Sequence, residues 1–169
     1  SGWKSPIYCD NRKILSYPAA RKVVYEAFVE IIKERFKNVD VIAGVATGAI
    51  AYGMMVAEVM GKPFVYVRPK PKDHGTGAQI EGDLPKGAKV VVVEDLISTG
   101  GSVLEVVEVL REAGAEVLGI ASIFTYGMKK GIDRMAAADV INYSLSNLDA
   151  VAEVAAEEGY IEKEDIARL

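Results

Sequence analysis

The sequence predicts an α/β fold, in which helices cover both faces of a parallel sheet. Four short segments are continuously apolar and rich in β-branched residues, which is typical of strands buried on both faces. Segments with apolar residues at helical spacing alternate with these strands. Such alternation indicates parallel strands joined by crossover helices.

The chain has 169 residues, of which 50% are hydrophobic and 26% charged, so we expect one globular domain over 1–169. Its 20 basic and 24 acidic residues give a net charge of −4, and no Lys/Arg-rich tract suggests a nucleic-acid partner. The single cysteine, Cys9, excludes an intrachain disulfide and favours a reducing, cytoplasmic location. The single histidine, His74, excludes a metal site with two histidines from one chain.

The longest uncharged stretch, residues 41–57, is shorter than the ~20 residues that a helix needs to cross a bilayer. It contains three glycines and changes from strand-like to helix-like, so we expect a buried strand followed by a helix and no membrane span. The chain begins at Ser1, without a signal-peptide pattern, and we expect that an N-terminal segment is missing.

The first half of the chain predicts two helices and two strands. The helices are expected over 17–36 and 49–60, the second ended by a left-handed cap at Gly61, and the strands over 39–45 and 64–68. The apolar positions of the first helix are Val23, Val24, Ala27, Phe28, Ile31 and Ile32.

The second half continues the alternation. It predicts strands over 89–93, 117–124 and 140–143, and helices over 102–113 and 148–158. Between the halves, residues 69–87 show no periodicity and contain prolines and glycines. Such a long loop in a compact domain is usually a functional lid or a disordered segment.

The turn after the strand at 89–93 carries the clearest chemistry. Glu94 and Asp95 end the strand, and residues 96–102, rich in hydroxyls and glycines, lead into a helix. Backbone N–H groups at a helix start favour a phosphate, and the two carboxylates accept hydrogen bonds from sugar hydroxyls. A phosphate beside a diol is a phosphoribose. The alternative is an ordinary strand end followed by a helix cap.

At this point the chain resembles a known family. Residues 90–102 (VVVVEDLISTGGS) resemble the phosphoribosyl-diphosphate (PRPP) signature of the type I phosphoribosyltransferases. Residues 1–12, 66–82 and 117–127 resemble the orotate phosphoribosyltransferases among them, so the similarity covers essentially the whole chain.

The resemblance implies the type I phosphoribosyltransferase fold: a parallel-strand sheet flanked by helices, with a mobile loop and a small N-terminal hood segment, here truncated. It implies transfer of the 5-phosphoribosyl group from PRPP to orotate in pyrimidine biosynthesis. The products are orotidine 5′-phosphate and pyrophosphate, and Mg²⁺ is held mainly through PRPP and water. It also implies a homodimer in which the loop 69–87 closes over the neighbouring site.

The resemblance assigns roles to particular residues. Glu94 and Asp95 hold the ribose hydroxyls, Ser98 also reaches orotate, and Lys72, His74 and Asp95 are the expected catalytic residues. The PRPP-binding set is Arg68, Lys72, His74, Glu94, Asp95, Leu96, Ile97, Ser98, Thr99, Gly100, Gly101 and Ser102.

The chemistry of the lid agrees with this assignment. Residues 68–74 carry three basic residues against one acid. Cationic donors that close around a leaving pyrophosphate stabilise its developing charge. Histidine titrates near neutral pH, so His74 is suited to protonate the departing oxygen. The alternatives are that His74 is an incidental surface residue and that Lys70 is only a solvated charge.

Three positions depart from the pattern of some relatives or have an open role. The turn 46–49 is expected to place backbone amides against pyrophosphate, but it lacks the lysine that some relatives carry. Residues 124–126 (Phe-Thr-Tyr) stand where others present an arginine to the base. Lys4 and Tyr8 are candidates for lining the orotate pocket, with exposure on a surface strand as the alternative.

Two other functions compete with orotate transfer. One is a phosphoribosyltransferase for another base, such as uracil or a purine. The other is a non-catalytic PRPP-sensing regulator of transcription, which would need a DNA-binding helix pair or a basic RNA-binding face.

Overall fold

The structure, a computed structural model, describes residues 9–70 and 78–168. Its centre is a six-stranded sheet in the order β3-β2-β1-β4-β5-β6. The strands are β1 (Val41–Val45), β2 (Phe64–Val67), β3 (Ile80–Glu81), β4 (Lys89–Ile97), β5 (Glu116–Thr125) and β6 (Asn142–Asn147). All neighbours are parallel except β2 and β3. The predicted α/β fold is confirmed.

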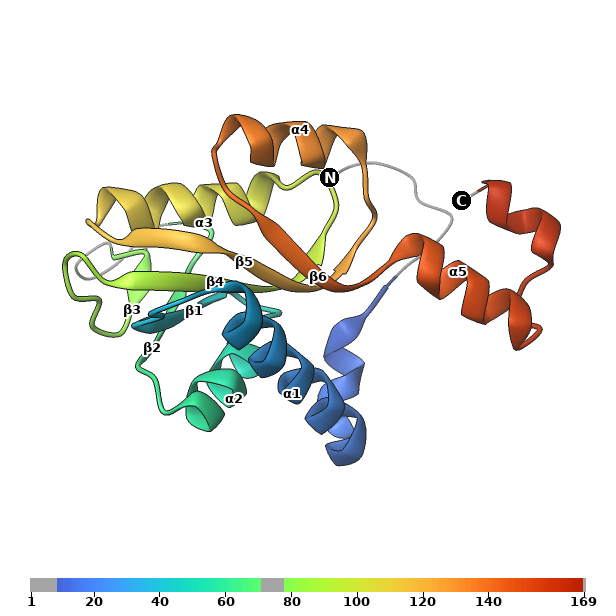
Figure 1. Cartoon of the computed structure of the whole chain (residues 1–169), viewed down its shortest axis with the longest axis horizontal. Coiled ribbons are helices and arrows are strands. Elements are labelled where there is room, and N and C mark those ends of the chain that lie inside the picture. The colour runs from blue at the N-terminus through green and yellow to red at the C-terminus, as the bar shows by residue number, and fades with distance from the viewer. Residues whose placement is uncertain (1–8, 71–77, 169) are drawn as a thin grey trace.

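Helices cover both faces of the sheet (Figure 1). On one face lie α1 (Pro18–Arg35) and α2 (Ile50–Met60), and on the other α3 (Gly101–Glu112) and α4 (Lys129–Ala137). A 3-10 helix, η1 (Asn11–Ser16), precedes α1. The helix α5 (Leu148–Glu157) and the 3-10 helix η2 (Lys163–Arg168) extend beyond the carboxyl end of β6. Within the described ranges, no helix has the length and apolar character to span a membrane.

The core follows from the central strands. All five residues of β1 and the four consecutive valines of β4 (90–93) are buried between the two helical layers. The α2 helix ends where the sequence predicts: Gly61 has a φ of 63°, and its N–H donates to the carbonyls of Ala57 and Glu58. Glycine adopts this left-handed conformation without a Cβ clash.

Some boundaries differ from the sequence-based prediction. β4 continues to Ile97 instead of ending at Val93, because the long strand β5 supplies partners for Glu94, Leu96 and Ile97. On α1, the predicted face is shifted: Val23 is 69% exposed, whereas Val29 is buried with Phe28 and Ile32.

Two elements near the site were not predicted. β3 has only two residues and lies within the aperiodic segment 69–87. α4 has only nine residues, with two lysines and a glycine in its first turn, so its apolar face is too short to stand out in the sequence. The predicted site residues Lys4, Tyr8, Lys72 and His74 lie outside the described residues.

Candidate active site

Three strand ends place the candidate site at one edge of the sheet. β1 lies between β2 and β4 and is parallel to both, so the carboxyl ends of these strands are neighbours (Figure 1). The turn 46–49 follows β1, Arg68 follows β2, and the turn Ser98–Gly100 follows β4. Segments far apart in the sequence therefore meet where ligands bind in parallel sheets.

Glu94 is a buried carboxyl group at the end of β4, with 5% of its surface exposed. Its Oε1 accepts a hydrogen bond from the Asp95 backbone N–H at 2.8 Å. The pKa of Glu94 is raised to about 9, mainly by burial and then by the neighbouring Asp95 side chain, against the lowering effect of hydrogen bonds from backbone amides. At neutral pH this group is therefore a neutral acid that can both donate and accept a hydrogen bond.

This bound proton predicts a pH-dependent stability. The pKa of Glu94 is raised from its ordinary 4.5 to about 9, so the folded protein holds one proton that the unfolded chain releases as pH rises between these values. The free energy of unfolding is then expected to fall over this range, by up to about 1.4 kcal/mol per pH unit. Chemical denaturation from pH 6 to 9 should show a weaker fall for Glu94→Gln, whose side chain is always neutral. The exposed Glu116→Gln serves as the control, and equal slopes in wild type and Glu94→Gln would contradict the prediction.

Asp95 is held close to two distant segments. The Asn11 side chain donates from Nδ2 to the Asp95 carbonyl oxygen at 2.8 Å. The Asp95 carboxylate lies over Gly48 in the turn after β1, so closely that a Cβ at Gly48 would overlap it. The carboxylate therefore faces the same turn that the sequence analysis places against pyrophosphate.

The turn Ser98–Gly100 joins β4 to α3 and forms a small cavity. Gly100 has a φ of 79° and precedes α3, and no side chain caps the helix start by a hydrogen bond. The cavity, of about 260 Å³, is lined by Glu94, Leu96, Ile97, Ser98, Thr99, Gly100, Gly101, Ser102, Val103 and Glu105. Uncapped N–H groups beside a glycine turn are the arrangement that favours an anion.

The α4 helix supports this turn from outside. A Cβ at Gly131 would lie only 2.8 Å from the Ser98 carbonyl oxygen, so the helix backbone packs directly on the turn. Arg134, which is exposed, donates from its guanidinium to the Thr99 carbonyl oxygen at 3.3 Å. The short helix thus contacts the turn at two successive residues.

Arg68 is fixed at the end of β2 by the strand that follows the loop. Its backbone N–H donates to the Gln79 carbonyl oxygen at 2.8 Å, and its Nε lies 3.3 Å from Glu81 Oε1. The antiparallel pair β2–β3 therefore joins the described residues on the two sides of the loop. Arg68 is half-exposed, with part of its guanidinium available to a ligand.

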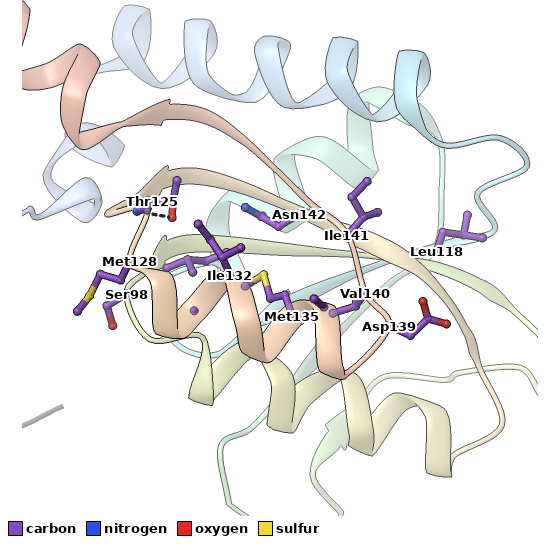
Figure 2. Close-up of a pocket in the computed structure, with 14 residues that line it drawn as sticks. Ser98, Leu118, Thr125, Met128, Ile132, Met135, Asp139, Val140, Ile141 and Asn142 are labelled. Carbon is purple, nitrogen blue, oxygen red and sulfur yellow. Dashed lines mark hydrogen bonds between the residues drawn. The ribbon is translucent and has the colours of Figure 1, made fainter.

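A larger, mostly apolar cavity of about 600 Å³ lies beside this site, between α4 and the sheet. Figure 2 shows Ser98 and Met128 at one end and Leu118 and Asp139 at the other, with Ile132 and Met135 of α4 over the middle. Thr125 also lines it, and its Oγ1 accepts a hydrogen bond from the Gly127 N–H at 3.1 Å. The cavity touches the candidate site at Ile97 and Ser98, but the acid pair does not line it.

Comparisons with known proteins fit this geometry. A family model described as a phosphoribosyl transferase domain matches residues 10–158. An orotate phosphoribosyltransferase of Bacillus cereus (strain B4264) is 56% identical over all 169 residues, which cover 80% of that protein. The chain belongs to the orotate phosphoribosyltransferase family. An orotate phosphoribosyltransferase of Bacillus mycoides (strain KBAB4) has the same identity and coverage.

Solved structures of this family and of related proteins share the fold. The crystal structure of orotate phosphoribosyltransferase from Aeropyrum pernix superposes with a TM-score of 0.82 at 34% identity, over 95% of this chain and 88% of that one. UMP synthase of Leishmania donovani gives a TM-score of 0.84 at 28% identity; the match covers 99% of this chain and 36% of that longer protein. Adenine phosphoribosyltransferase of Trypanosoma brucei, at 22% identity and a TM-score of 0.70, shares the fold.

Sequence analysis missed the residues that surround the acid pair. Asn11 stands within a segment that resembles the orotate phosphoribosyltransferases, but no local pattern links it to Asp95, 84 positions away. Gly48 was singled out only as part of a turn, not as the residue under the Asp95 carboxylate. Gly131 and Arg134 lie on the helix that was not predicted.

Proposed function

We propose that the chain transfers the 5-phosphoribosyl group from PRPP to orotate and releases pyrophosphate, in de novo pyrimidine biosynthesis. The observation that carries this proposal is the acid pair at the end of β4, followed by an uncapped helix start. It stands in a chain that is 56% identical over its full length to an orotate phosphoribosyltransferase.

The end of β4 is proposed to bind the ribose 5-phosphate part of PRPP. The 5′-phosphate would occupy the cavity lined by residues 96–102, where backbone N–H groups and hydroxyls supply donors. Asp95 would accept hydrogen bonds from the ribose hydroxyls. Neutral Glu94 would donate to one hydroxyl oxygen without adding a second negative charge beside the phosphate.

The pyrophosphate part of PRPP is proposed to lie toward β1 and β2. Arg68 at the end of β2, with Lys72 and His74 from the loop, would neutralise its charge, and amides of the turn 46–49 would add hydrogen bonds. This turn lies beside the Asp95 carboxylate, so pyrophosphate and ribose would bind next to each other.

Orotate is proposed to bind beside Ser98, where the phosphate cavity meets the apolar cavity next to α4. Ser98 would donate a hydrogen bond to the base. Lys4 and Tyr8 remain candidates for the other side of the base, and the sequence supplies no arginine at residues 124–126 for this contact.

Mg²⁺ is proposed to be bound mainly through PRPP oxygens and water. In residues 9–70 and 78–168, no three His, Cys, Asp or Glu side chains gather as metal ligands, and Glu94 is held neutral. The residues present fit a cation that arrives with its substrate, which is the usual behaviour of Mg²⁺ at phosphates. When bound, the ion would offset the charge of the diphosphate.

The reaction needs positioning and electrostatics rather than a protein nucleophile. The bond between the anomeric carbon and the pyrophosphate oxygen breaks, and its electron pair leaves with pyrophosphate. Orotate N1 forms the new bond to that carbon and loses its proton, which balances the proton that the pyrophosphate takes up. The chain's own residues would orient the ribose at Asp95, stabilise the leaving group at Arg68 and Lys72, and protonate it at His74.

We further propose that residues 1–169 form one phosphoribosyltransferase domain, which works in the cytoplasm as a homodimer. A single continuous sheet and core support the single domain, and the absence of paired cysteines from the sequence fits a reducing compartment. The loop 69–87 of each subunit would close over the neighbouring site.

The experiment that tests this function measures pyrophosphate release as a function of PRPP, Mg²⁺ and base. We expect release with orotate and much less with uracil or adenine. Turnover of a purine but not of orotate would favour a phosphoribosyltransferase for another base. Binding to nucleic acid without orotate consumption would favour the regulator.

A further inference from the structure

Asn11 connects the N-terminal part of the described chain to the acid pair. It is 7% exposed, and both ends of its side-chain amide have partners. Nδ2 donates to the Asp95 carbonyl oxygen at 2.8 Å, and Oδ1 accepts from the Cys9 thiol at 3.3 Å. Since donor and acceptor are both engaged, the orientation of this amide is determined by its surroundings.

The core in turn holds Asn11. Tyr52 of α2 is fully buried, and its hydroxyl donates to the Asn11 carbonyl oxygen at 2.6 Å. The Tyr52 ring packs against Phe28 of α1, with ring centroids 6.4 Å apart. Asn11 is therefore attached to the two helices that cover this face of the sheet, and it transmits their position to Asp95.

Gly48 lies against the carboxylate of Asp95. The missing Cβ at this position leaves the space that the Asp95 carboxylate occupies. The backbone of Asp95 is thus held by Asn11, while its carboxylate lies on the turn after β1. A ribose diol needs a carboxylate at hydrogen-bond distance and angle, and both deteriorate with small displacements.

We propose that Asn11 is a positioning residue for Asp95, which fixes the carboxylate for the ribose hydroxyls of PRPP. The inference rests on the proposed function of Asp95 and adds that the tyrosine–asparagine pair outside the PRPP signature determines its placement. An asparagine suits this position because an aspartate there would set a carboxylate against the Asp95 carbonyl oxygen, in a region that already contains Asp10 and Asp95.

Affinity for PRPP tests the proposal. Asn11→Ala and Asn11→Asp are expected to raise the Kd for PRPP with Mg²⁺, measured by titration calorimetry, by roughly tenfold or more. In steady state, kcat/KM for PRPP should fall while the KM for orotate stays near its wild-type value. The matched control is Asn142→Ala, which also removes two side-chain hydrogen bonds, with Ser122 and Ser144, in β6.

A double-mutant cycle separates positioning from general stability. In an Asp95→Ala background, Asn11→Ala is expected to leave the remaining PRPP affinity unchanged, because the carboxylate through which it acts is gone. Tyr52→Phe removes only the hydroxyl that holds the Asn11 carbonyl oxygen, and it should weaken PRPP binding through Asn11. It tests the proposal if the Asn11 variants fold poorly.

Each result supports or overturns the inference. If wild type binds PRPP and a folded Asn11→Ala variant binds it equally well, Asn11 does not position Asp95. If the Asn11 variants do not fold, unchanged PRPP affinity in Tyr52→Phe leads to the same conclusion. If Asn11→Ala lowers PRPP affinity by the same factor in the Asp95→Ala background as in wild type, Asn11 does not act through the Asp95 carboxylate. If wild type itself binds no PRPP, the proposed function fails, and the role of Asn11 fails with it.

Discussion

Replacement of Asp95 by asparagine is expected to lower kcat/KM for PRPP by about 10- to 100-fold, the cost of losing hydrogen bonds to a charged acceptor. The asparagine keeps the size of the side chain over Gly48 but replaces one acceptor oxygen by a donor. A donor cannot accept from a ribose hydroxyl. Binding of orotate should change far less, because orotate is proposed to contact Ser98.

Initial rates at varied PRPP and varied orotate measure both effects in one experiment. Asp149→Asn is the matched control, because this exposed aspartate lies in α5 and lines neither cavity of the candidate site. Equal losses for PRPP and orotate would contradict the role of Asp95 in holding the ribose diol.

Replacement of Lys72 by alanine is expected to lower kcat by about two to three orders of magnitude, with little effect on the free energy of unfolding. Pyrophosphate gains negative charge as it leaves, and a cation that contacts it acts mainly in the transition state. Single-turnover kinetics and thermal denaturation of the same sample separate the two effects. Lys62→Ala provides the control, because this exposed lysine precedes β2 and lies outside the loop 69–87. Undiminished activity of Lys72→Ala would show that the lid assignment is wrong.

The Lys72 and Asp95 variants together test whether the lid acts across subunits. If the loop closes over the neighbouring site, mixed dimers of Lys72→Ala and Asp95→Asn subunits contain one intact site each. Random exchange would then restore about a quarter of the wild-type sites, since half of the dimers are mixed and half of their sites are intact. If the loop closes over its own subunit, every site keeps one defect and activity stays low after mixing.

The sequence predicted those elements whose characteristic residues follow one another in the chain. The valines of β4 predicted a strand buried on both faces, because such a strand needs apolar residues at every position. Gly61 predicted the end of α2, because a left-handed helix cap favours glycine. The acid pair with its turn predicted a phosphoribose site for the same reason: strand end, carboxylates, glycines and helix start follow one another in the chain.

The parts that were not predicted depend on partners far away in sequence. The extension of β4 to Ile97 requires β5 as its neighbour. The nine-residue helix α4 packs on the phosphate turn at Gly131, a contact that its short sequence does not reveal. The contact of Asn11 with Asp95 joins residues 84 positions apart, so no repeat or spacing could indicate it.

Gly131, in the first turn of α4, restricts how this helix can be stabilised. Gly131 is an unfavourable residue for a helix of nine positions, and alanine there would be favoured by about 1 kcal/mol on intrinsic propensity alone. That methyl group would press on the Ser98 carbonyl oxygen and displace the turn that holds the phosphate. Helix propensity alone would therefore recommend a substitution that the packing of α4 on the turn opposes. The contact with the phosphate turn thus decides which residue the helix can carry at this position.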